Sequence, residues 1–301
     1  MSLARRRQWG YGQGVHDLVE EHESDEATRT QLKEHLLDLF RAPTYRPPLL
    51  PAVALELLAL TRQPDVDLPE VVALLGHDPM LAGQVLRVAR SAAYSRGEPL
   101  RSLEEAVVRL GLSRIADIFL RVSLESKVFR APGFSEPMAQ LRRHSTFTAE
   151  AARLVCQRTS GLEDSGYLCG LLHDVGIAAC LLALSGPLRG AFDGSFERAW
   201  PCIESVHTSC SEMLARLWGL PADVVLVVGQ HHIHEPSAPL HPVAAAVAYA
   251  DCFSAQLGLG FLTETQPEHL PAMARQLGLS GAEQERLTAV LRAIAASLES
   301  S

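Results

Sequence analysis

The middle of the chain contains a long apolar run that one histidine and one aspartate interrupt. Residues 168–184 read LCGLLHDVGIAACLLAL, and His173 and Asp174 are their only polar side chains apart from two cysteines. A run of this length without a hydrophilic face predicts a helix that is buried on all sides. A buried carboxylate is costly unless a positive group neutralises it, and the nearest Lys or Arg in sequence are Arg158 and Arg189. We therefore favour a divalent cation held by histidines.

Length and composition describe an ordinary globular protein. The 301 residues are 47% hydrophobic and 21% charged, which suits one large domain or two modest ones. The net charge of −8 argues against general nucleic-acid binding, because counterion release needs clustered cations. No run of 18 or more apolar residues lacks a turn signal or a charge, so we expect no membrane span. The basic start, MSLARRR, lacks the apolar stretch of a secretory signal.

The cysteines fall inside apolar or amphipathic segments and show no paired spacing. They are Cys156, Cys169, Cys180, Cys202, Cys210 and Cys252. This pattern is typical of reduced, buried thiols rather than of a disulfide framework or a thiolate metal site. We therefore expect a cytoplasmic protein.

Helical periodicity dominates the chain, and no convincing strand alternation is present. The sequence therefore predicts an all-α protein. Breaks rich in proline or glycine at residues 42–48 and 131–133 suggest boundaries. The expected organisation is an N-terminal helical extension over residues 1–45, a central domain over residues 46–260 with halves 46–130 and 131–260, and a C-terminal helical extension over residues 261–301.

Individual helices are predicted from the same periodicity. They cover residues 51–60, 68–75, 79–92, 103–110, 113–124, 136–158, 165–184, 196–217, 221–231, 242–257 and 283–298. In the charged segment before them, one apolar stripe is formed by Leu32, Leu36, Leu37 and Phe40. Asp78 followed by Pro79 is typical of a helix start. Ser102 with Glu105 three residues later fits a capping box.

Several histidines and aspartates are predicted to face the protein interior. His144 and His207 each lie on an apolar helical stripe, and the His231-His232 pair ends the apolar segment ADVVLVVGQ. Asp251 is the only charged residue of PVAAAVAYADCF. With the first pair, the candidate ligands are His144, His173, Asp174, His207, His231, His232 and Asp251. Imidazole and carboxylate together suit one or two divalent transition metals, namely Fe, Mn, Zn, Co or Ni.

Each of these residues also has a purely structural interpretation. A single inward histidine is more often a core residue bonded to a backbone carbonyl group. His231 and His232 could cap a helix C-terminus, where histidine suits the macrodipole. His173 and Asp174 could form a neutral pair, although adjacent helical side chains face each other poorly. The joint pattern, with one cluster per predicted helix, favours metal binding.

Longer motifs resemble the HDOD family of the HD superfamily. LPAVALELL, LLGHDPMLAGQVLRVARSAAYS and SLEEAVVRLGLSRI are similar to that family's N-terminal helical half, with Arg90 where the family usually has Asn. GLLHDVG, ESVHTSCSEMLARLWGLP and VVGQHH are similar to its HD-like half. The resemblance covers residues 48–257. It implies a multi-helix bundle with an N-terminal helical half and an HD-like C-terminal half, in a bacterial regulatory protein.

The seven candidate ligands also resemble the complete metal-binding set of HD-GYP phosphodiesterases, which cleave cyclic di-GMP. That resemblance implies a two-metal centre in which Asp174 is the bridging carboxylate. Three positions depart from the pattern. Ile177 replaces a phosphate-contacting lysine, residues 233–242 replace the GYP loop, and Gln140 stands where relatives with a third metal place an acid.

These observations predict a signalling protein that couples a stimulus, a nucleotide or a metal state to a partner protein. The first alternative is a metal-dependent phosphohydrolase acting on a nucleotide or a cyclic dinucleotide. Its candidate phosphate-binding cations are Arg142, Arg143 and Arg216. The second alternative is a di-iron oxygenase, since other HD relatives use the same ligands with iron.

Overall fold

The regular structure of the protein is helical wherever the structure describes it. The computed structural model describes residues 30–63, 65–91, 94, 100–189, 195–232, 241–261 and 269–299, and the predicted all-α class is confirmed. After a helical stretch at residues 30–41, the helices are α2 (Ala52–Leu60), α3 (Leu68–Gly76), α4 (Pro79–Ala89), α5 (Leu103–Leu110), α6 (Leu112–Lys127), α7 (Ser135–Thr159), α8 (Glu163–Leu172), α9 (Val175–Ser185), α10 (Phe196–Leu217), α11 (Ala222–Gly229), α12 (Pro242–Gln256), α13 (Leu270–Gln276) and α14 (Gly281–Glu299).

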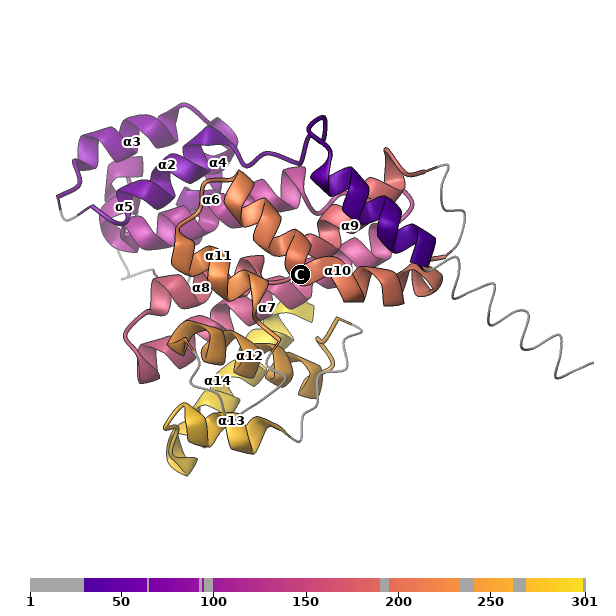
Figure 1. The fold of residues 1–301 in the computed structure, drawn as a ribbon. Coiled ribbons are helices and arrows are strands. Elements are labelled where there is room, and N and C mark those ends of the chain that lie inside the picture. Colours follow the sequence, from indigo (N-terminus) through magenta and orange to yellow (C-terminus); the bar gives the residue numbers. More distant parts are fainter. Residues whose placement is uncertain are drawn as a thin grey trace, which may run out of the picture.

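Helices α2–α6 share one hydrophobic core. Figure 1 shows them at one end of the molecule. Helix α6 packs against α2, α4 and α5, and α3 packs against α4 and α5. Fully buried members of this core include Leu57, Leu75, Val85 and Ile115. Each is an inward position of a helix that the sequence periodicity predicts.

The predicted helix starts in this half are confirmed. The Leu81 N–H donates to Asp78 Oδ1 over 3.1 Å, as expected of an N-cap aspartate. The Glu105 N–H donates to Ser102 Oγ over 3.1 Å. The Glu105 carboxylate accepts from the N–H of Arg101 over 2.8 Å, one residue before the cap. The capping box therefore closes on the residue before Ser102 rather than on Ser102 itself.

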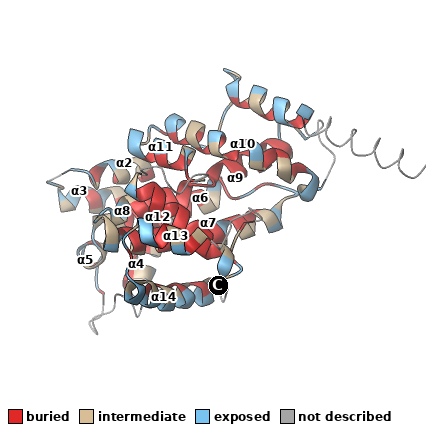
Figure 2. Cartoon of the chain, turned by 60° about the horizontal axis from the view of Figure 1, so that its bottom comes forward, coloured by how far each residue is buried: buried red, intermediate tan, exposed pale blue. Residues whose placement is uncertain are grey.

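The second half is built around helices α7 to α12 and has a larger core. Helix α7 packs along α8, α12 and α14, and α10 packs along α9 and α11. Figure 2 shows α8 and α12 buried over most of their length. In α12 every residue from Val243 to Ser254 is buried. Any polar side chain on these helices therefore needs a partner inside the protein.

The apolar run at Glu163–Ser185 is long and apolar enough to cross a membrane by length and composition. However, 89% of the tested window is buried inside the protein. Burial against α7, α10 and α12 accounts for the composition, as it does for core helices in general.

The helical stretch at residues 30–41 contributes to the core of the second half. Leu32, Leu36 and Phe40 belong to that core, and Figure 1 places this stretch beside α9 and α10, away from α2–α5. The chain then continues past Pro48, whose carbonyl oxygen accepts from Trp218 Nε1 over 2.9 Å. Residues 1–29 of the predicted extension lie outside the described residues.

Helix α13, at Leu270–Gln276, was not predicted from the sequence. It has only seven residues, of which Leu270, Met273 and Ala274 are buried. Two turns provide too few apolar positions to establish a helical period, and only packing against α12 reveals it.

A charged cluster joins the two halves of the protein. The Arg153 guanidinium group on α7 contacts the Asp117 carboxylate on α6 and lies 3.3 Å from Asp164 Oδ1 on α8. Arg114 on α6 pairs with Glu150 on α7 at 3.0 Å. Asp117 is only 6% exposed, so its charge depends on these guanidinium groups.

Burial raises the pKa of Asp117 from 3.8 to about 7, although Arg153 and Arg114 act in the opposite direction. The folded state therefore binds this proton more tightly than the unfolded state does. The resulting stability is fully present below pH 4 and is lost as the pH rises to about 7. Asp117→Asn removes this dependence. Its free energy of unfolding should rise relative to that of the wild type over this range, by up to about 1.4 kcal/mol per pH unit.

Urea unfolding at a series of pH values measures the difference. Asp164→Asn is the matched control, because the Asp164 side chain shares the Arg153 partner but is 56% exposed. Its stability difference from the wild type should change little between pH 4 and 7. A difference for Asp117→Asn that is equally constant would contradict the assignment.

Candidate metal centre

The structure brings all seven candidate ligands together from five parts of the chain. One group contains Asp174, His207, His231 and His232, and the other contains His144, His173 and Asp251. Within each group the ligand atoms lie within 4.8 Å of one another. Six of the seven residues are buried, and His232 is half-buried.

The His173-Asp174 pair lies in a turn, not inside a helix. Helix α8 ends at Leu172 and α9 begins at Val175, so the prediction of one continuous helix over residues 165–184 is wrong at this point. Asp174 has φ −102° and ψ 14°, outside the helical region. In a regular helix neighbouring side chains project about 100° apart. The break allows both side chains to reach the same centre.

The His231-His232 pair also lies beyond a helix end. Helix α11 stops at Gly229, two residues before the predicted end at residue 231. Gln230 leaves the helical conformation with φ −132°. His231 then turns back, and its Nδ1 lies 2.9 Å from the carbonyl oxygen of Val228. His231 thus has the capping role that the structural interpretation predicts, and it has a second nitrogen to offer.

The Nδ1 atoms of four of the five candidate histidines lie against backbone carbonyl groups. In His173, His207 and His231, Nδ1 lies 2.7 to 2.9 Å from the carbonyl oxygen three residues earlier. Nδ1 of His144 lies 3.1 Å from the Leu259 oxygen. A carbonyl oxygen only accepts, so Nδ1 carries the proton. In the neutral ring Nε2 then presents a lone pair, which is the arrangement found in metal-binding histidines.

The Nε2 atoms converge on one another. Nε2 of His144 lies 3.0 Å from Nε2 of His173, and Nε2 of His207 lies 2.9 Å from that of His232. Two lone pairs at such distances repel unless a proton or a cation lies between them. A core histidine bonded to a carbonyl group needs no such convergence. The arrangement therefore fits cation binding better than a structural role alone.

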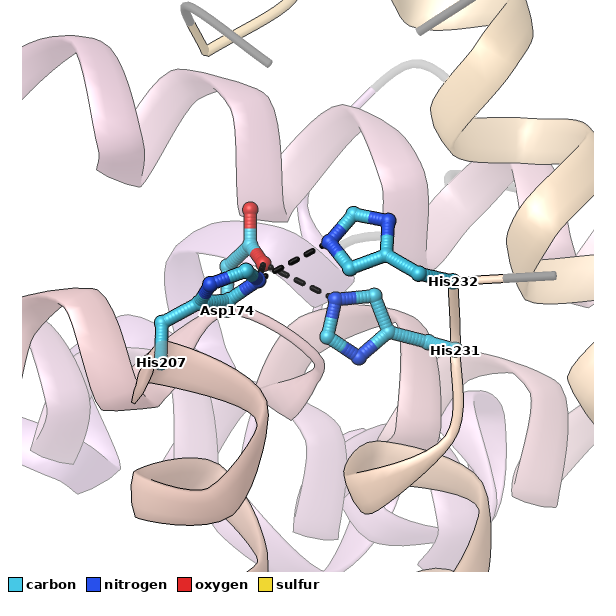
Figure 3. A group of neighbouring side chains, drawn as sticks. All are labelled: Asp174, His207, His231 and His232. Atoms are coloured by element: carbon cyan, nitrogen blue, oxygen red, sulfur yellow. Dashed lines mark hydrogen bonds and ion pairs between the residues drawn. The ribbon is translucent and has the colours of Figure 1, made fainter. Parts of the chain in front are cut away.

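Asp174 lies between the two groups, with one carboxylate oxygen facing each. Oδ2 is 3.2 Å from His173 Nε2 and 3.4 Å from His144 Nε2. Oδ1 is 3.1 Å from His231 Nε2 and 3.5 Å from His207 Nε2. Figure 3 shows the second side of this arrangement, with the three imidazoles around Asp174. Each oxygen of Asp174 therefore faces imidazole nitrogens of a different group.

Three polar atoms of the centre are buried and have no assigned hydrogen bond among the described residues, although two of them lie 3.1 Å apart as an ion-pair contact. They are Asp174 Oδ1, His231 Nε2 and Asp251 Oδ1. The Asp251 oxygen lies 3.4 Å from His144 Nε2. Buried polar atoms are nearly always satisfied in native proteins. Atoms that are all potential ligands and all lack a donor fit a centre that takes up a cation.

The protonation of the centre is set by burial and by contacts among the candidate ligands. Burial alone would raise the pKa of Asp174, but the imidazoles around it, His173 first, hold that pKa well below its ordinary value. Burial and the neighbouring His231 lower the pKa of His232 to about 3. Burial likewise lowers the pKa of His207. Burial lowers the pKa of His144, but Asp174 and Asp251 outweigh burial and raise it. Metals bind the ionised carboxylate and the neutral imidazole, so protons that these imidazoles share with the carboxylates must leave when a metal binds.

The departures from the HD-GYP pattern have structural counterparts. Ile177 is fully buried in α9, so this position offers no cation to a phosphate. Gln140 Nε2 donates to the carbonyl oxygen of Gly260 over 3.1 Å. The Gln140 side chain therefore bonds to the backbone of the segment that follows α12. Residues 233–240 of the replaced loop lie outside the described residues.

The candidate phosphate-binding arginines have no special placement. Arg216 pairs with Glu212 on its own helix at 2.6 Å. Arg143 lies 3.9 Å from Glu136, and Arg142 is exposed. Paired or solvated side chains of this kind are common on helix surfaces, so these contacts do not mark a phosphate site.

Sequence reasoning did not single out two residues beside the centre. A Cβ atom on Gly176 would lie 2.0 Å from the carbonyl oxygen of His207, so only glycine fits this contact between α9 and α10. Ser211 on α10 hydrogen-bonds to the backbone on both sides of Asp174. Its spacing of four residues from His207, which places both on one helix face, is the one sequence signal for it.

The HDOD domain family model matches residues 48–234. The chain belongs to the HDOD family. This confirms the predicted family, and the matched residues include six of the seven candidate ligands of the HDOD centre; Asp251 lies beyond the match.

Solved structures confirm the HDOD helical bundle. A protein of Shewanella amazonensis SB2B that carries the name metal-dependent phosphohydrolase aligns with TM-score 0.69 and 22% identity, over 90% of this chain and 99% of that one. An HDOD domain protein of Geobacter sulfurreducens aligns with TM-score 0.67 and 24% identity, over 91% of this chain and 98% of that one. At these identities the likeness concerns the fold.

A curated relative is about twice as long as the part that this chain matches. An uncharacterized protein of Treponema pallidum (strain Nichols) is 27% identical over 266 residues, which is 84% of this chain. The chain spans 49% of that protein's length.

Proposed function

We propose that this HDOD protein is a bacterial signalling protein whose centre binds divalent transition metal, with room for two ions. The observation that carries the proposal is the position of Asp174, whose two oxygens face two separate groups of imidazoles at 3.1 to 3.5 Å. A carboxylate so placed would offer one oxygen ligand to a cation on each side and would offset part of their charge. The donor set of imidazole and carboxylate favours Fe, Mn, Zn, Co or Ni.

The residues divide into two sets of ligands that share one carboxylate. One ion would be held by His207, His231, His232 and Asp174 Oδ1, and the other by His144, His173, Asp251 and Asp174 Oδ2. When bound, such ions supply Lewis-acid chemistry toward a phosphoryl oxygen. The chain's own contribution is to hold three of the imidazoles as Nδ1–H tautomers through backbone carbonyl groups and to keep Asp174 ionised.

A regulatory role is supported by how closed the centre is. Six of its seven residues are buried, and His232 is half-buried. Ile177, which stands where the HD-GYP pattern has a phosphate-contacting lysine, is fully buried and offers no cation. We infer that the protein is cytoplasmic and that binding of a metal or a nucleotide at this centre changes how its surface binds a partner protein in a signalling pathway.

A metal-dependent phosphohydrolase is the second candidate function. The observation that favours it is the complete set of seven converging residues, and the name of the Shewanella protein agrees with it. Its substrate would be a nucleotide or a cyclic dinucleotide, and Asp174 would then be the metal-bridging carboxylate.

Elemental analysis of protein purified without an affinity tag or added metal tests the proposal. We expect up to two equivalents of one of the named metals in the wild type, and its loss in His173→Ala/Asp174→Ala. The matched control is His77→Ala/Asp78→Ala, a His-Asp pair at the start of α4, outside the centre. It should lose about 1 kcal/mol with the helix cap and keep the metal. A folded wild type that stays metal-free after reconstitution would contradict the proposal.

Two further measurements separate the candidate functions. Turnover on a panel of nucleotides and cyclic dinucleotides that disappears in His173→Ala/Asp174→Ala identifies a hydrolase. A partner protein that binds the metal-loaded wild type, without such turnover, identifies a regulatory protein.

A further inference from the structure

The turn that carries His173 and Asp174 leaves two backbone groups without their helical partners. In a regular helix the Ile177 N–H would donate to the His173 carbonyl oxygen. Here it donates to Asp174 O over 3.0 Å. The His173 carbonyl group therefore needs another donor. The Gly176 N–H, at the start of α9, likewise needs another acceptor.

One hydroxyl group satisfies both backbone groups. Ser211 Oγ accepts from the Gly176 N–H over 2.9 Å and donates to the His173 carbonyl oxygen over 2.7 Å. Ser211 is 0% exposed. A hydroxyl can donate and accept at the same time, whereas an apolar side chain of the same size would leave both groups unpaired in the interior.

Ser211 also links two ligand-bearing elements directly. It lies one helical turn after His207 on α10, and its bonds reach the residues on either side of Asp174. A Cβ atom on Gly176 would lie 2.6 Å from the Ser211 nitrogen, so α9 and α10 are pressed together here. The position of the turn relative to His207 is therefore set at Ser211.

We propose that Ser211 is a positioning residue of the metal centre. Its hydroxyl group holds the non-helical turn that presents His173 and Asp174 to the two groups of ligands. This inference rests on the proposed metal-binding function. Ser211 contacts backbone alone in these two bonds, so it acts on the metal through the placement of other ligands.

Titration of the full-length protein with Co²⁺, followed by visible absorption, tests the inference. In Ser211→Ala we expect a Co²⁺ dissociation constant that is higher by roughly 10- to 100-fold, as for other residues that orient metal ligands. The absorption bands should also change, because they report the ligand geometry. Ser211→Cys keeps a weaker donor and acceptor and should lie between the wild type and Ser211→Ala.

Two controls separate positioning from general destabilisation. Ser123→Ala removes another buried hydroxyl group, which has no hydrogen-bond partner among the described residues. Val107→Ala weakens the core of the first half. Both should bind Co²⁺ with the affinity and spectrum of the wild type, even where their unfolding midpoint falls.

A folded Ser211→Ala protein with unchanged Co²⁺ affinity and spectrum would overturn the inference. If Ser211→Ala does not fold, Ser211→Cys decides in the same way. A wild type that binds no Co²⁺ overturns the proposed function and the inference with it, and this outcome is distinguishable because the wild type itself fails.

Discussion

Asp174→Asn should abolish metal binding at both groups of ligands in the centre. The amide nitrogen cannot act as a ligand, and the substitution removes the negative charge that lies 3.1 to 3.5 Å from four imidazole nitrogens. Loss of an orienting partner alone typically costs 10- to 100-fold in metal affinity. Loss of a shared ligand should therefore cost more than about 100-fold on each side, and bound metal should fall toward zero.

Comparison with the metal content of His232→Ala tests whether Asp174 serves both groups of ligands. His232 belongs to one group, and its Nε2 atom faces His207. Its removal should lower metal occupancy on that side and leave the other ion bound. The expected order of metal content is therefore wild type, then His232→Ala, then Asp174→Asn.

Elemental analysis after dialysis, at equal protein concentration, measures this order. Asp223→Asn, an exposed carboxylate on α11, is the matched control and should keep all of its metal. An Asp174→Asn protein that loses no more metal than His232→Ala would show that Asp174 serves one group only.

Gly176→Ala should cause a large loss of stability. The added Cβ atom would lie 2.0 Å from the His207 carbonyl oxygen and 2.6 Å from the Ser211 nitrogen. Both are backbone atoms, so no side-chain rotation relieves the contact. Helix α9 must move away from α10. Overpacking of a core typically costs 1 to 3 kcal/mol, and we expect about 3 kcal/mol or more here, together with weaker metal binding.

Gly83→Ala is the matched control for this substitution. Gly83 lies inside α4, and a Cβ atom there would meet nothing within 4 Å. Alanine in a helix interior is favoured over glycine by roughly 0.5 to 1 kcal/mol, so this variant should be slightly more stable than the wild type. Urea or thermal unfolding distinguishes the two. Equal stability of Gly176→Ala and the wild type would mean that α9 and α10 leave room for a Cβ atom at residue 176.

Local patterns in the sequence were enough to predict most of the fold. The spacing of apolar residues identified the helices that carry His144 and His207, because helical packing repeats every three to four residues. The burial of Asp174 and Asp251 followed from their apolar surroundings. Composition alone could not have indicated a cluster; the repeated placement of histidine and aspartate at inward positions did.

The tertiary structure decided how the side chains of the candidate ligands are oriented toward one another. Nothing local indicates that the helix over residues 165–184 breaks at Asp174, because the hydroxyl group that bonds to the broken turn belongs to Ser211, which lies 38 positions after His173. The same limit applies to the helical stretch at residues 30–41, whose apolar stripe was visible but whose packing partners were not.

The sequence by itself determined the class of the fold, most of its helices and the chemical identity of the candidate ligands, because these follow from side-chain type and short-range spacing. Only the tertiary structure decided that the Nε2 atoms converge, that Asp174 lies between two groups and that Ser211 holds the turn. Each of these depends on hydrogen bonds and contacts between helices far apart in the chain. The periodicity of apolar residues within one helix does not predict such contacts between helices.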